Sequence, residues 1–345
     1  MQYDFIAFIG RFEPFHNGHL SVVWRALQNC DRLIVLIGSA QSARSTRNPF
    51  SSAEREVMLR AALGKDADRV VIRHIPDHLY NEGAWQADVQ HNVSEAVKAA
   101  GKKLSDSSIG LIGHEKDESS WYLHAFPQWN LIDVPFVSGL SATELREHLF
   151  SEDDGALRLV EANVPKPVFE TLLAFRKTKA FAQLAEEYRH FSAYKAAWAA
   201  APYPPTFTTV DAVIVHSGHV LLVKRGAQPG KGLWALPGGF VNQQETLLTA
   251  ALRELKEETR IKLPLPVLRG SLKGQRVFDE PDRSQRGRTI THAFYFEFPS
   301  GDLPQVRGAD DAARARWVQL AEARQMRELL FEDHYFILEH FIGAA

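Results

Sequence analysis

The stretch GFVNQQETLLTAALRELKEETRI, residues 239–261, predicts a helix that packs on a sheet. Pro237, Gly238 and Gly239 mark a turn just ahead of that helix. Apolar side chains then recur at i, i+3, i+4 and i+7, which places them on one helical face. These apolar positions are Leu248, Ala251, Leu252 and Leu255. We therefore expect a domain in which this helix covers a sheet.

Three glutamates occupy a neighbouring face of the same helix. Glu254, Glu257 and Glu258 follow the spacing i, i+3, i+4, so we expect their carboxylates to converge. Arg253 lies four residues before Glu257, where it can hold that carboxylate in position. Clustered carboxylates repel one another, and hard oxygen ligands favour Mg²⁺ or Mn²⁺. A solvated acidic helix face is the alternative, but it does not explain the offsets of the glycine turn and Glu245.

The spacing Gly239-x5-Glu245-x7-Arg253-Glu254-Leu255-x-Glu257-Glu258 resembles the Nudix box. The resemblance implies a metal-dependent pyrophosphate hydrolase, with Mg²⁺ or Mn²⁺ as the cofactor. It assigns the metal to Glu254, Glu257 and Glu258, catalytic roles to Arg253 and Glu257, and a substrate loop to Gly238 and Gly239. Arg260 departs from the pattern, because the family usually has glycine there to end the helix.

A second motif opens the chain. The apolar run at residues 3–10 predicts a strand, and the turn RFEPFHNGH at residues 11–19 leads into a helix. Backbone N–H groups at a helix start favour a bound phosphate. His16 and His19 lie three residues apart at that start. The pattern indicates a phosphate site at the end of the first strand.

Gly10-Arg11-Phe12-x-Pro-Phe followed by His16-x-Gly18-His19 resembles the nucleotidyltransferase superfamily. Further segments narrow the resemblance to nicotinamide-mononucleotide (NMN) adenylyltransferases of the archaeal type, over roughly residues 1–175. These segments are Gly38-Ser39-Ala40-Gln41, Arg47-Asn48-Pro49-Phe50, Glu54-Arg55, Pro76-Asp77, Asn81, Trp85 and Leu140-Ser141-x-Thr143-x-x-Arg146.

The resemblance implies ATP binding by the first and last motifs, with a Mg²⁺ in this domain too. The residues concerned are Gly10, Arg11, Phe12, His16, Gly18, His19, Ser141, Thr143 and Arg146. His16, His19 and Arg146 would act in catalysis by offsetting phosphate charge. Arg47, Asn81 and Trp85 would bind the mononucleotide, with the nicotinamide ring stacked on the indole.

Simpler roles compete for some of these residues. Trp85 taken alone is more typical of a core aromatic than of a stacking platform. Ser141 has the spacing to Glu144 of a helix capping box. His114 and Asp117 follow a further strand, and we expect them near the site without ranking them as ligands.

Length and composition bound the architecture and the class of partner. A chain of 345 residues suits two domains, each with its own core. The net charge of −2 does not steer the protein to nucleic acid or to a membrane surface. A single cysteine, Cys30, excludes an internal disulfide and favours a cytoplasmic location. The basic run at residues 283–288 is typical of a polar loop.

Strand and helix patterns predict an α/β doubly wound parallel sheet followed by an α+β Nudix fold. The expected strands of the first sheet are residues 3–9, 33–37, 70–75, 109–112 and 130–134. Residues 168–201 read as helical until prolines at 202–205 break the pattern. We expect a nucleotidyltransferase domain at 1–175, a helical linker at 176–205 and a Nudix domain at 206–345. A hairpin at 208–216 and 220–225 and strands at 291–298 and 316–318 belong to the last.

The two resemblances together imply a bifunctional enzyme of NAD metabolism. It would make NAD and pyrophosphate from ATP and nicotinamide mononucleotide, and hydrolyse ADP-ribose to AMP and ribose 5-phosphate. Its partners would be these small nucleotides. Alternatives are another nucleoside diphosphate substrate, a non-catalytic metabolite sensor in the second half, and a different adenylyl- or cytidylyltransferase in the first half, such as one acting on pantetheine phosphate. The sequence leaves open the oligomeric state, the choice between nicotinamide and nicotinic acid mononucleotide, and the hydrolytic base. Candidates for that base are Glu280, Asp310, Asp311, Glu332 and Asp333.

Overall fold

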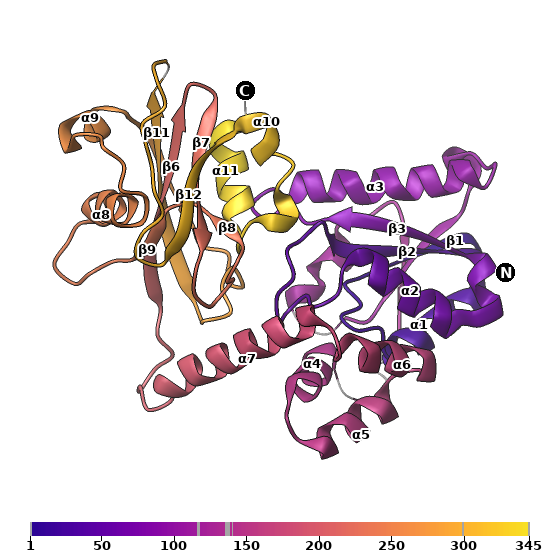
Figure 1. The fold of residues 1–345 in the computed structure, drawn as a ribbon. Helices are drawn as coiled ribbons and strands as arrows, with labels where there is room; N and C mark the ends of the chain where they lie inside the picture. Colours follow the sequence, from indigo (N-terminus) through magenta and orange to yellow (C-terminus); the bar gives the residue numbers. More distant parts are fainter. Residues whose placement is uncertain (1, 116–117, 135–138, 140, 299, 344–345) are drawn as a thin grey trace. The chain divides into compact units, whose positions relative to one another are not determined.

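The computed structural model describes residues 2–115, 118–134, 139, 141–298 and 300–343. The chain forms two compact units, Met1–Ala185 and Glu186–Ala345 (Figure 1). The division falls inside helix α7 (Lys179–Ala197), so the two halves of that helix belong to different units.

A five-stranded parallel sheet of order β3-β2-β1-β4-β5 organises the first unit. Its strands are β1 (Tyr3–Gly10), β2 (Cys30–Ala40), β3 (Val70–Pro76), β4 (Ile109–Gly113) and β5 (Asn130–Asp133). Its helices are α1 (Asn17–Asn29), α2 (Ser52–Leu63), α3 (Glu82–Ala99), α4 (Ala142–Phe150), α5 (Asp154–Asn163) and α6 (Lys166–Phe175), with 3-10 turns η1 (Gly64–Arg69), η2 (Leu104–Asp106) and η3 (Glu118–His124). The expected strands and the doubly wound class are confirmed.

Helices cover both faces of this sheet. Figure 1 shows α3 on one face and α1 and α2 on the other. The α3 side buries residues such as Val93 of α3 against Ala7 and Ile34 of the strands. Because strand side chains alternate in direction, neighbours such as Ile6 and Leu33 face the other way and are also fully buried. This double burial explains why the strands read as continuous apolar runs.

The order of the strands places the first motif where the direction of strand addition reverses. From β1 the chain continues to β2, which pairs with one edge of β1. Strand β4 pairs with the other edge of β1. At such a point the carboxyl ends of parallel strands open a ligand site. Gly10 ends β1 and Gly113 ends β4, so the turn that carries His16 and His19 starts there.

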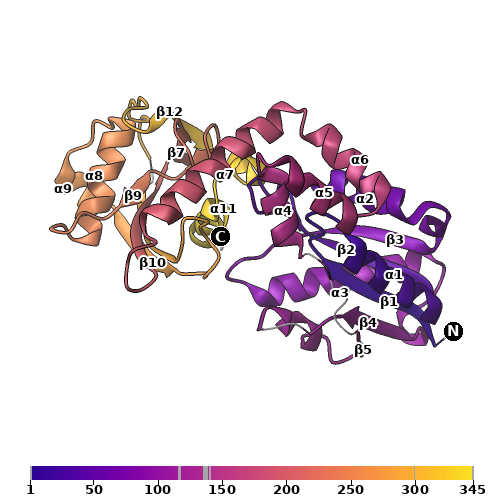
Figure 2. The same ribbon diagram turned by 90° about the horizontal axis from the view of Figure 1, so that it is seen from below.

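The helical region near the middle of the chain is interrupted, contrary to the continuous helix expected over residues 168–201. Helix α6 ends at Phe175, and α7 begins at Lys179. Thr178 causes the restart, because its hydroxyl accepts a hydrogen bond of 3.1 Å from the N–H of Phe181. Figure 2 shows α4, α5 and α6 grouped beside α2.

A seven-stranded mixed sheet of order β10-β11-β6-β7-β12, with β8 on β7 and β9 on β6, organises the second unit. Its strands are β6 (Phe207–His216), β7 (His219–Arg225), β8 (Trp234–Ala235), β9 (Gly238–Phe240), β10 (Leu272–Phe278), β11 (Thr289–Phe298) and β12 (Ala312–Gln319). Its helices are α8 (Leu247–Thr259), α9 (Leu265–Gly270), α10 (Leu320–Ala323) and α11 (His334–Ile342), with η4 (Arg327–Leu329). Leu252 and Leu255 of α8 pack on Val210 and Phe294 of the sheet, as the apolar stripe predicted.

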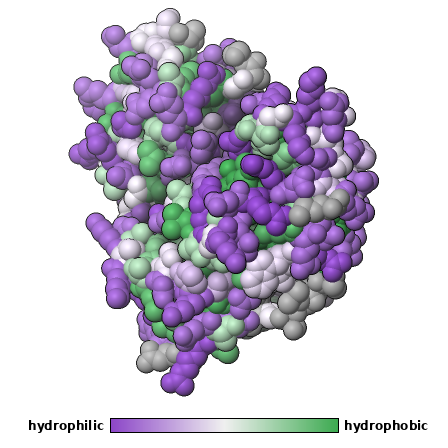
Figure 3. Space-filling model, turned by 90° about the vertical axis from the view of Figure 1, so that its right-hand side faces the viewer, coloured by the Kyte–Doolittle hydropathy of each residue, from purple (hydrophilic) through white to green (hydrophobic). Residues whose placement is uncertain are grey.

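No helix among the described residues is long and apolar enough to cross a membrane. Hydrophilic residues cover most of the face drawn in Figure 3, and hydrophobic ones are scattered among them. Cys30 is buried and has a free thiol.

Candidate active sites

The turn after β1 is shaped by two glycines and an aromatic ring. Phe12 adopts a left-handed backbone conformation (φ 55°), which brings its ring back over the strand end. A Cβ on Gly10 would lie 2.8 Å from that ring, and one on Gly18 would lie 3.0 Å from the imidazole of His16. A side chain at Gly10 would therefore displace the ring of Phe12, and one at Gly18 would crowd the imidazole of His16.

His16 and His19 stack on one another at the start of α1. Their ring centroids are 3.6 Å apart, and the N–H of His16 lies 3.3 Å from Nδ1 of His19. Because Nδ1 of His19 accepts this bond, the compatible neutral tautomer carries its proton on Nε2. Burial lowers the pKa of His16 to about 4 and holds the pKa of His19 well below its usual range. Both rings are neutral near pH 7, and each has one N–H for an anion.

Three arginines face the same turn. Arg146 of α4 donates a hydrogen bond of 2.7 Å to the carbonyl of Glu13 and one of 3.2 Å to Oγ1 of Thr143. Burial, together with the positive charges of Arg11 and Arg47, lowers the pKa of Arg146 to about 10. Arg11 and Arg47 are therefore near enough to repel the guanidinium group of Arg146. Such a cluster suits a polyphosphate, whose charge would relieve that repulsion.

Two of the expected ligand residues cap helices. The hydroxyl of Ser141 accepts a hydrogen bond of 3.3 Å from the N–H of Glu144, and the carboxylate of Glu144 accepts one of 2.7 Å from the N–H of Ser141. The capping box is confirmed. Asn81 likewise caps α3, because its Oδ1 accepts a hydrogen bond of 3.1 Å from Ala84. These contacts place both side chains at helix starts, where phosphates bind well.

The expected stacking residue Trp85 lies among aromatics of η3 and the turn after it. Its ring is 5.5 Å from Trp121, which is 44 % exposed, and 5.9 Å from the buried Phe126. Trp85 is partly buried and packs on the core of the first unit. His114 bonds the carbonyl of Val134 at 2.9 Å. Asp117 lies outside the described residues.

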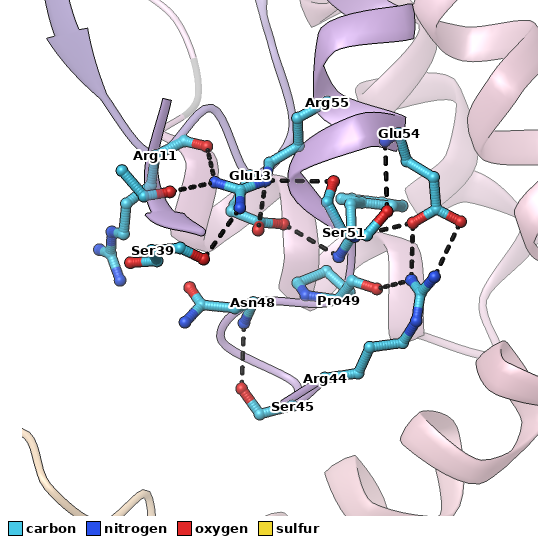
Figure 4. Close-up of polar contacts among 12 residues, drawn as sticks. Arg11, Glu13, Ser39, Arg44, Ser45, Asn48, Pro49, Ser51, Glu54 and Arg55 are labelled. Carbon is cyan, nitrogen blue, oxygen red and sulfur yellow. Dashed lines mark hydrogen bonds and ion pairs between the residues drawn. The ribbon is translucent and has the colours of Figure 1, made fainter. Parts of the chain in front are cut away.

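A buried ion pair behind the turn went unnoticed in the sequence. Glu13 and Arg55 are each 1 % exposed, and Arg55 reaches the backbone of the turn (Figure 4). The available hint was the placement of Glu13 between Phe12 and Pro14-Phe15.

In the second unit, the glycine turn is packed too closely for any side chain. A Cβ on Gly238 would lie 2.2 Å from the carbonyl oxygen of Val210, and one on Gly239 would lie 2.5 Å from Oε1 of Glu254. Strand β9, which contains both glycines, pairs with β6 through Val210 and Asp211. The glycines thus let the turn rest directly against the acidic helix.

Arg253 connects most of the acidic residues of α8 and the turn. It donates two hydrogen bonds to Glu245, of 2.6 and 3.0 Å, and one of 2.9 Å to each of Glu254 and Glu257. It also bonds the carbonyl of Phe240 at 3.1 Å. The expected contact between Arg253 and Glu257 is confirmed. A guanidinium with this many partners fixes the carboxylates and the loop together.

Glu258 turns toward the glycine turn. Its Oε2 accepts a hydrogen bond of 3.1 Å from the N–H of Gly238, and the residue is only 7 % exposed. Burial raises the pKa of Glu258 to about 8, and it also raises the pKa of Glu254, with the charges of Glu257 and Asp310 adding to the rise. No three acidic, histidine or cysteine side chains in the described parts of the chain form a ready metal cluster. The expected convergence is therefore partial, because Arg253 holds Glu254 and Glu257 while Glu258 bonds the turn.

The donor set nonetheless fits a hard divalent cation. Carboxylate oxygens are the ligands that Mg²⁺ and Mn²⁺ prefer. The raised pKa values of Glu254 and Glu258 reflect desolvated negative charge that a cation would neutralise.

Helix α8 ends at Arg260, which occupies the position where the Nudix pattern usually has glycine. Its backbone is left-handed (φ 50°, ψ 27°), and its N–H bonds the carbonyl of Lys256 at 3.0 Å. The helix therefore ends as a glycine would end it, at the cost of backbone strain.

The candidate bases are in different surroundings. Asp333 is fully buried, and both its oxygens accept hydrogen bonds from Arg283, of 2.7 and 2.8 Å, which makes it structural. The basic run that contains Arg283 forms a loop as expected, but Arg283 itself is buried. Glu332 has a left-handed backbone (φ 46°), lies 3.4 Å from Arg286, and has a buried Oε1 without a hydrogen-bond partner. Asp310 is exposed and left-handed (φ 54°).

Glu332 belongs to a segment that runs beside the glycine turn. Phe331 donates a backbone hydrogen bond of 2.8 Å to Trp234, and Leu236 donates one of 2.9 Å to Nδ1 of His334. The charges of Glu332 and Glu258 both act on the pKa of Arg225, which burial lowers most. Glu332 and Glu258 therefore both lie near Arg225. Sequence spacing gave no sign of this, because Glu332 and the box are far apart in the chain.

Asp211 is a further buried acid that the sequence did not single out. It accepts a hydrogen bond of 2.6 Å from the hydroxyl of Thr291, and its other oxygen is 3.8 Å from Nε2 of His334. Its place in an apolar strand was the available signal, because a buried carboxylate needs partners.

Comparisons with known proteins cover both units. Residues 7–147 match the cytidylyltransferase-like family, and residues 205–341 match the NUDIX domain family. A nicotinamide/nicotinic acid mononucleotide adenylyltransferase of Acinetobacter baylyi is 35% identical over 190 residues, which are 54% of this chain and 95% of that protein. An ADP-ribose pyrophosphatase of Methanocaldococcus jannaschii is 38% identical over 133 residues, 39% of this chain and 71% of that protein.

A solved structure matches both units in a single chain. It is a bifunctional NMN adenylyltransferase/ADP ribose pyrophosphatase from Francisella tularensis, complexed with AMP and a manganese ion. The match has a TM-score of 0.89 and 36% sequence identity, and it covers 99% of each chain.

Proposed function

The chain belongs to the family of bifunctional NMN adenylyltransferase/ADP-ribose pyrophosphatases, and from this premise we propose how its residues divide the two reactions. The family assignment makes it an enzyme of NAD biosynthesis and ADP-ribose hydrolysis. The observation that carries the proposal is the presence of both motif sets in one chain that aligns over 99% of its length with a bifunctional relative.

In the first unit, an oxygen of the mononucleotide phosphate attacks the α-phosphorus of ATP. The bond from that phosphorus to the β-phosphate oxygen breaks, so NAD and pyrophosphate leave. His16, His19 and Arg146 offset the charge that develops on the transferring phosphate. The neutral imidazoles donate N–H groups, and the nearby arginines supply the positive charge. Gly10, Arg11, Phe12, Gly18, Ser141 and Thr143 complete the ATP site.

The mononucleotide lies on the side of Trp85 in this proposal. Arg47 pairs with its phosphate, Asn81 and the start of α3 hold its polar groups, and the indole stacks on the pyridine ring. Support comes from the cap geometry of Asn81 and from the aromatic cluster around Trp85. Both nicotinamide and nicotinic acid mononucleotide belong in the assay.

In the second unit, water attacks one phosphorus of ADP-ribose. The bridging P–O bond breaks, the water proton passes to a base, and AMP and ribose 5-phosphate leave. Glu254, Glu257 and Glu258 would hold a divalent ion, Mg²⁺ or Mn²⁺, which supplies charge neutralisation and activates water when bound. Arg253 holds Glu245 and Glu257 in place, and Gly238 and Gly239 let the diphosphate approach the backbone.

The partners in this proposal are ATP, nicotinamide mononucleotide, NAD and ADP-ribose, and the location is the cytoplasm. Mg²⁺ serves both units, in the first as the ion that accompanies the ATP phosphates. The domain boundaries proposed are 1–175, a helical linker at 176–205, and 206–345. The alternatives of a sensor or another diphosphate substrate are not favoured, because relatives of both halves are enzymes of these two reactions.

Two assays on the full chain test the proposal. ATP with each mononucleotide and Mg²⁺ should give NAD or its acid analogue with pyrophosphate, and ADP-ribose with Mg²⁺ or Mn²⁺ should give AMP. A panel of other nucleoside diphosphate derivatives serves as the comparison. Failure to form either product, or faster hydrolysis of another diphosphate, would contradict the assignment of that unit.

A further inference from the structure

Arg55 of α2 is a fully buried cation whose donors all point at backbone carbonyls or at Glu13. Its Nη1 donates hydrogen bonds of 2.6 Å to the carbonyls of Arg11 and Gly38, and Nη2 donates one of 3.0 Å to Ser39. Its Nε contacts the carbonyl of Ser51 at 3.4 Å. Figure 4 shows the guanidinium between these segments. One side chain thus joins the ends of β1 and β2 to the start of α2.

Glu13 extends this connection to two further segments. Its Oε1 lies 3.1 Å from Nε of Arg55, a contact that is ionic because its angle does not make a hydrogen bond. Its Oε2 accepts a hydrogen bond of 3.1 Å from the N–H of Phe50, which ends the loop that carries Arg47. Its backbone carbonyl accepts the bond from Arg146.

This pair is a poor device for stability alone. Removing two charges from water carries a large desolvation cost, and an apolar pair of the same shape is often as stable. The rigid fork of arginine, in contrast, fixes several partners in one geometry. The segments fixed here are those that carry Arg11, His16, Arg47 and Arg146.

We propose that Arg55 and Glu13 are positioning residues for adenylyl transfer. The buried pair holds the turn after β1, the loop before α2 and the guanidinium of Arg146 in one arrangement, so that their cationic and N–H groups meet the phosphates together. Neither side chain touches the substrate, because both are enclosed by protein. The proposal rests on the assignment of adenylyl transfer to this unit.

Arg55→Lys is the first test, made in the full-length chain. Lysine keeps the charge opposite Glu13 but has a single ammonium group, which cannot reach the carbonyls of Arg11, Gly38 and Ser39 together. We expect kcat for NAD synthesis at saturating substrates to fall about tenfold or more, since small misplacements of charged groups act on the transition state. ADP-ribose hydrolysis by the same preparation should be unchanged and reports correct folding of the other unit.

Arg60→Lys is the matched control. Arg60 lies on the same helix, but it is exposed and pairs with Glu56 at 2.8 Å. The variant Arg60→Lys should therefore keep full kcat for NAD synthesis. Thermal unfolding of each variant sets an assay temperature well below its transition. A variant Arg55→Lys with full kcat at that temperature, whatever its stability, would overturn the proposal and leave the pair a structural one.

Glu13→Gln provides a second test that does not depend on the folding of the first variant. Glutamine keeps the acceptor for the N–H of Phe50 but removes the charge that faces Arg55. We expect the same loss in kcat, and the double variant should lose less than the product of the two single losses, because both act through one pair. Full kcat in Glu13→Gln would contradict the proposed role of the pair. A loss in the double variant equal to the product of the two single losses would contradict it as well. If the unmodified chain makes no NAD, the proposed function is what fails.

Discussion

The backbone N–H of Gly238 donates a hydrogen bond of 3.1 Å to Oε2 of Glu258, which joins the glycine turn to the acidic helix. The bond explains why the motif contains both elements at a fixed offset. A side chain at residue 238 would overlap the carbonyl of Val210, so the turn reaches Glu258 only as glycine. The carboxylate in turn is buried and carries a raised pKa.

The first prediction concerns the pH dependence of stability through Glu258. Its pKa rises from 4.5 to about 8 on folding, so the folded state binds more protons than the unfolded state between these values. Stability without metal should therefore be greatest below about pH 4.5 for this group and fall as the pH rises through about 8. Glu258→Gln should remove that fall. Chemical unfolding at a series of pH values, with EDTA, measures it.

Mg²⁺ provides the control for this prediction. If Glu258 helps to hold the cation, metal should flatten the pH dependence of the parent chain and leave the variant unaffected.

Hydrolysis of ADP-ribose by Glu258→Gln or Glu257→Gln should fall by orders of magnitude, while NAD synthesis continues. Full hydrolysis in the double variant would place the chemistry elsewhere.

The second prediction concerns the hydrolytic base. Glu332 lies in the segment that runs beside the glycine turn and has a buried carboxylate oxygen without a hydrogen-bond partner, whereas Asp310 is exposed. We expect Glu332→Gln to lower kcat for ADP-ribose by about a hundredfold or more with little change in KM, on the scale of general-base catalysis. Asp310→Asn should lose less than tenfold. The reverse order of the two losses would assign the base to Asp310.

The third prediction concerns His19. His19→Ala should lower kcat for NAD synthesis by about a hundredfold, on the scale of losing one donor to a developing charge. Hydrolysis of ADP-ribose should not change, and an equal loss of both activities would indicate misfolding. NMR titration without nucleotide should show both imidazoles neutral down to about pH 5, because burial depresses the pKa of His16 to about 4 and that of His19 further below its usual range. A midpoint near 6.5 for either ring would contradict that.

The fourth prediction concerns Trp85. Because this ring packs on the core as well as on Trp121, Trp85→Ala should lower the stability of the protein. It should also raise KM for the mononucleotide by a factor that corresponds to about 1–3 kcal/mol of lost binding free energy, and leave KM for ATP unchanged. Trp85→Phe keeps an aromatic surface and should recover most of the binding. If KM for the mononucleotide stays unchanged while stability falls, Trp85 is a core residue only.

The fifth prediction concerns where the chain can be divided. Glu187 of α7 accepts a hydrogen bond of 2.8 Å from the N–H of Gly230, and Trp198 packs on Phe207 at 5.5 Å. A fragment of residues 186–345 keeps both contacts, and one of residues 206–345 loses them. Both should fold and hydrolyse ADP-ribose, with the shorter one less stable in thermal unfolding. A shorter fragment that folds but does not hydrolyse would contradict the independence of the two activities.

Local spacing was enough to predict several features of the sites. The i, i+3, i+4 pattern fixed which glutamates share a face of α8, and the contact of Arg253 with Glu257 followed from one helical turn. The capping box of Ser141 and Glu144 followed in the same way. The end of α8 at Arg260 was less certain, because the residue adopts a left-handed backbone without being glycine.

By itself, the sequence determined the two fold classes, many of their strands and the motif residues, because these depend on periodicity and on neighbours within a few residues. Only the tertiary structure decided that Arg55 supports the turn of His16, and that Glu332 rather than Asp333 has a carboxylate oxygen without a partner. The physical reason is distance along the chain. Arg146 and Glu13 are 133 residues apart, and only the packing of strands and helices brings such groups within hydrogen-bonding distance.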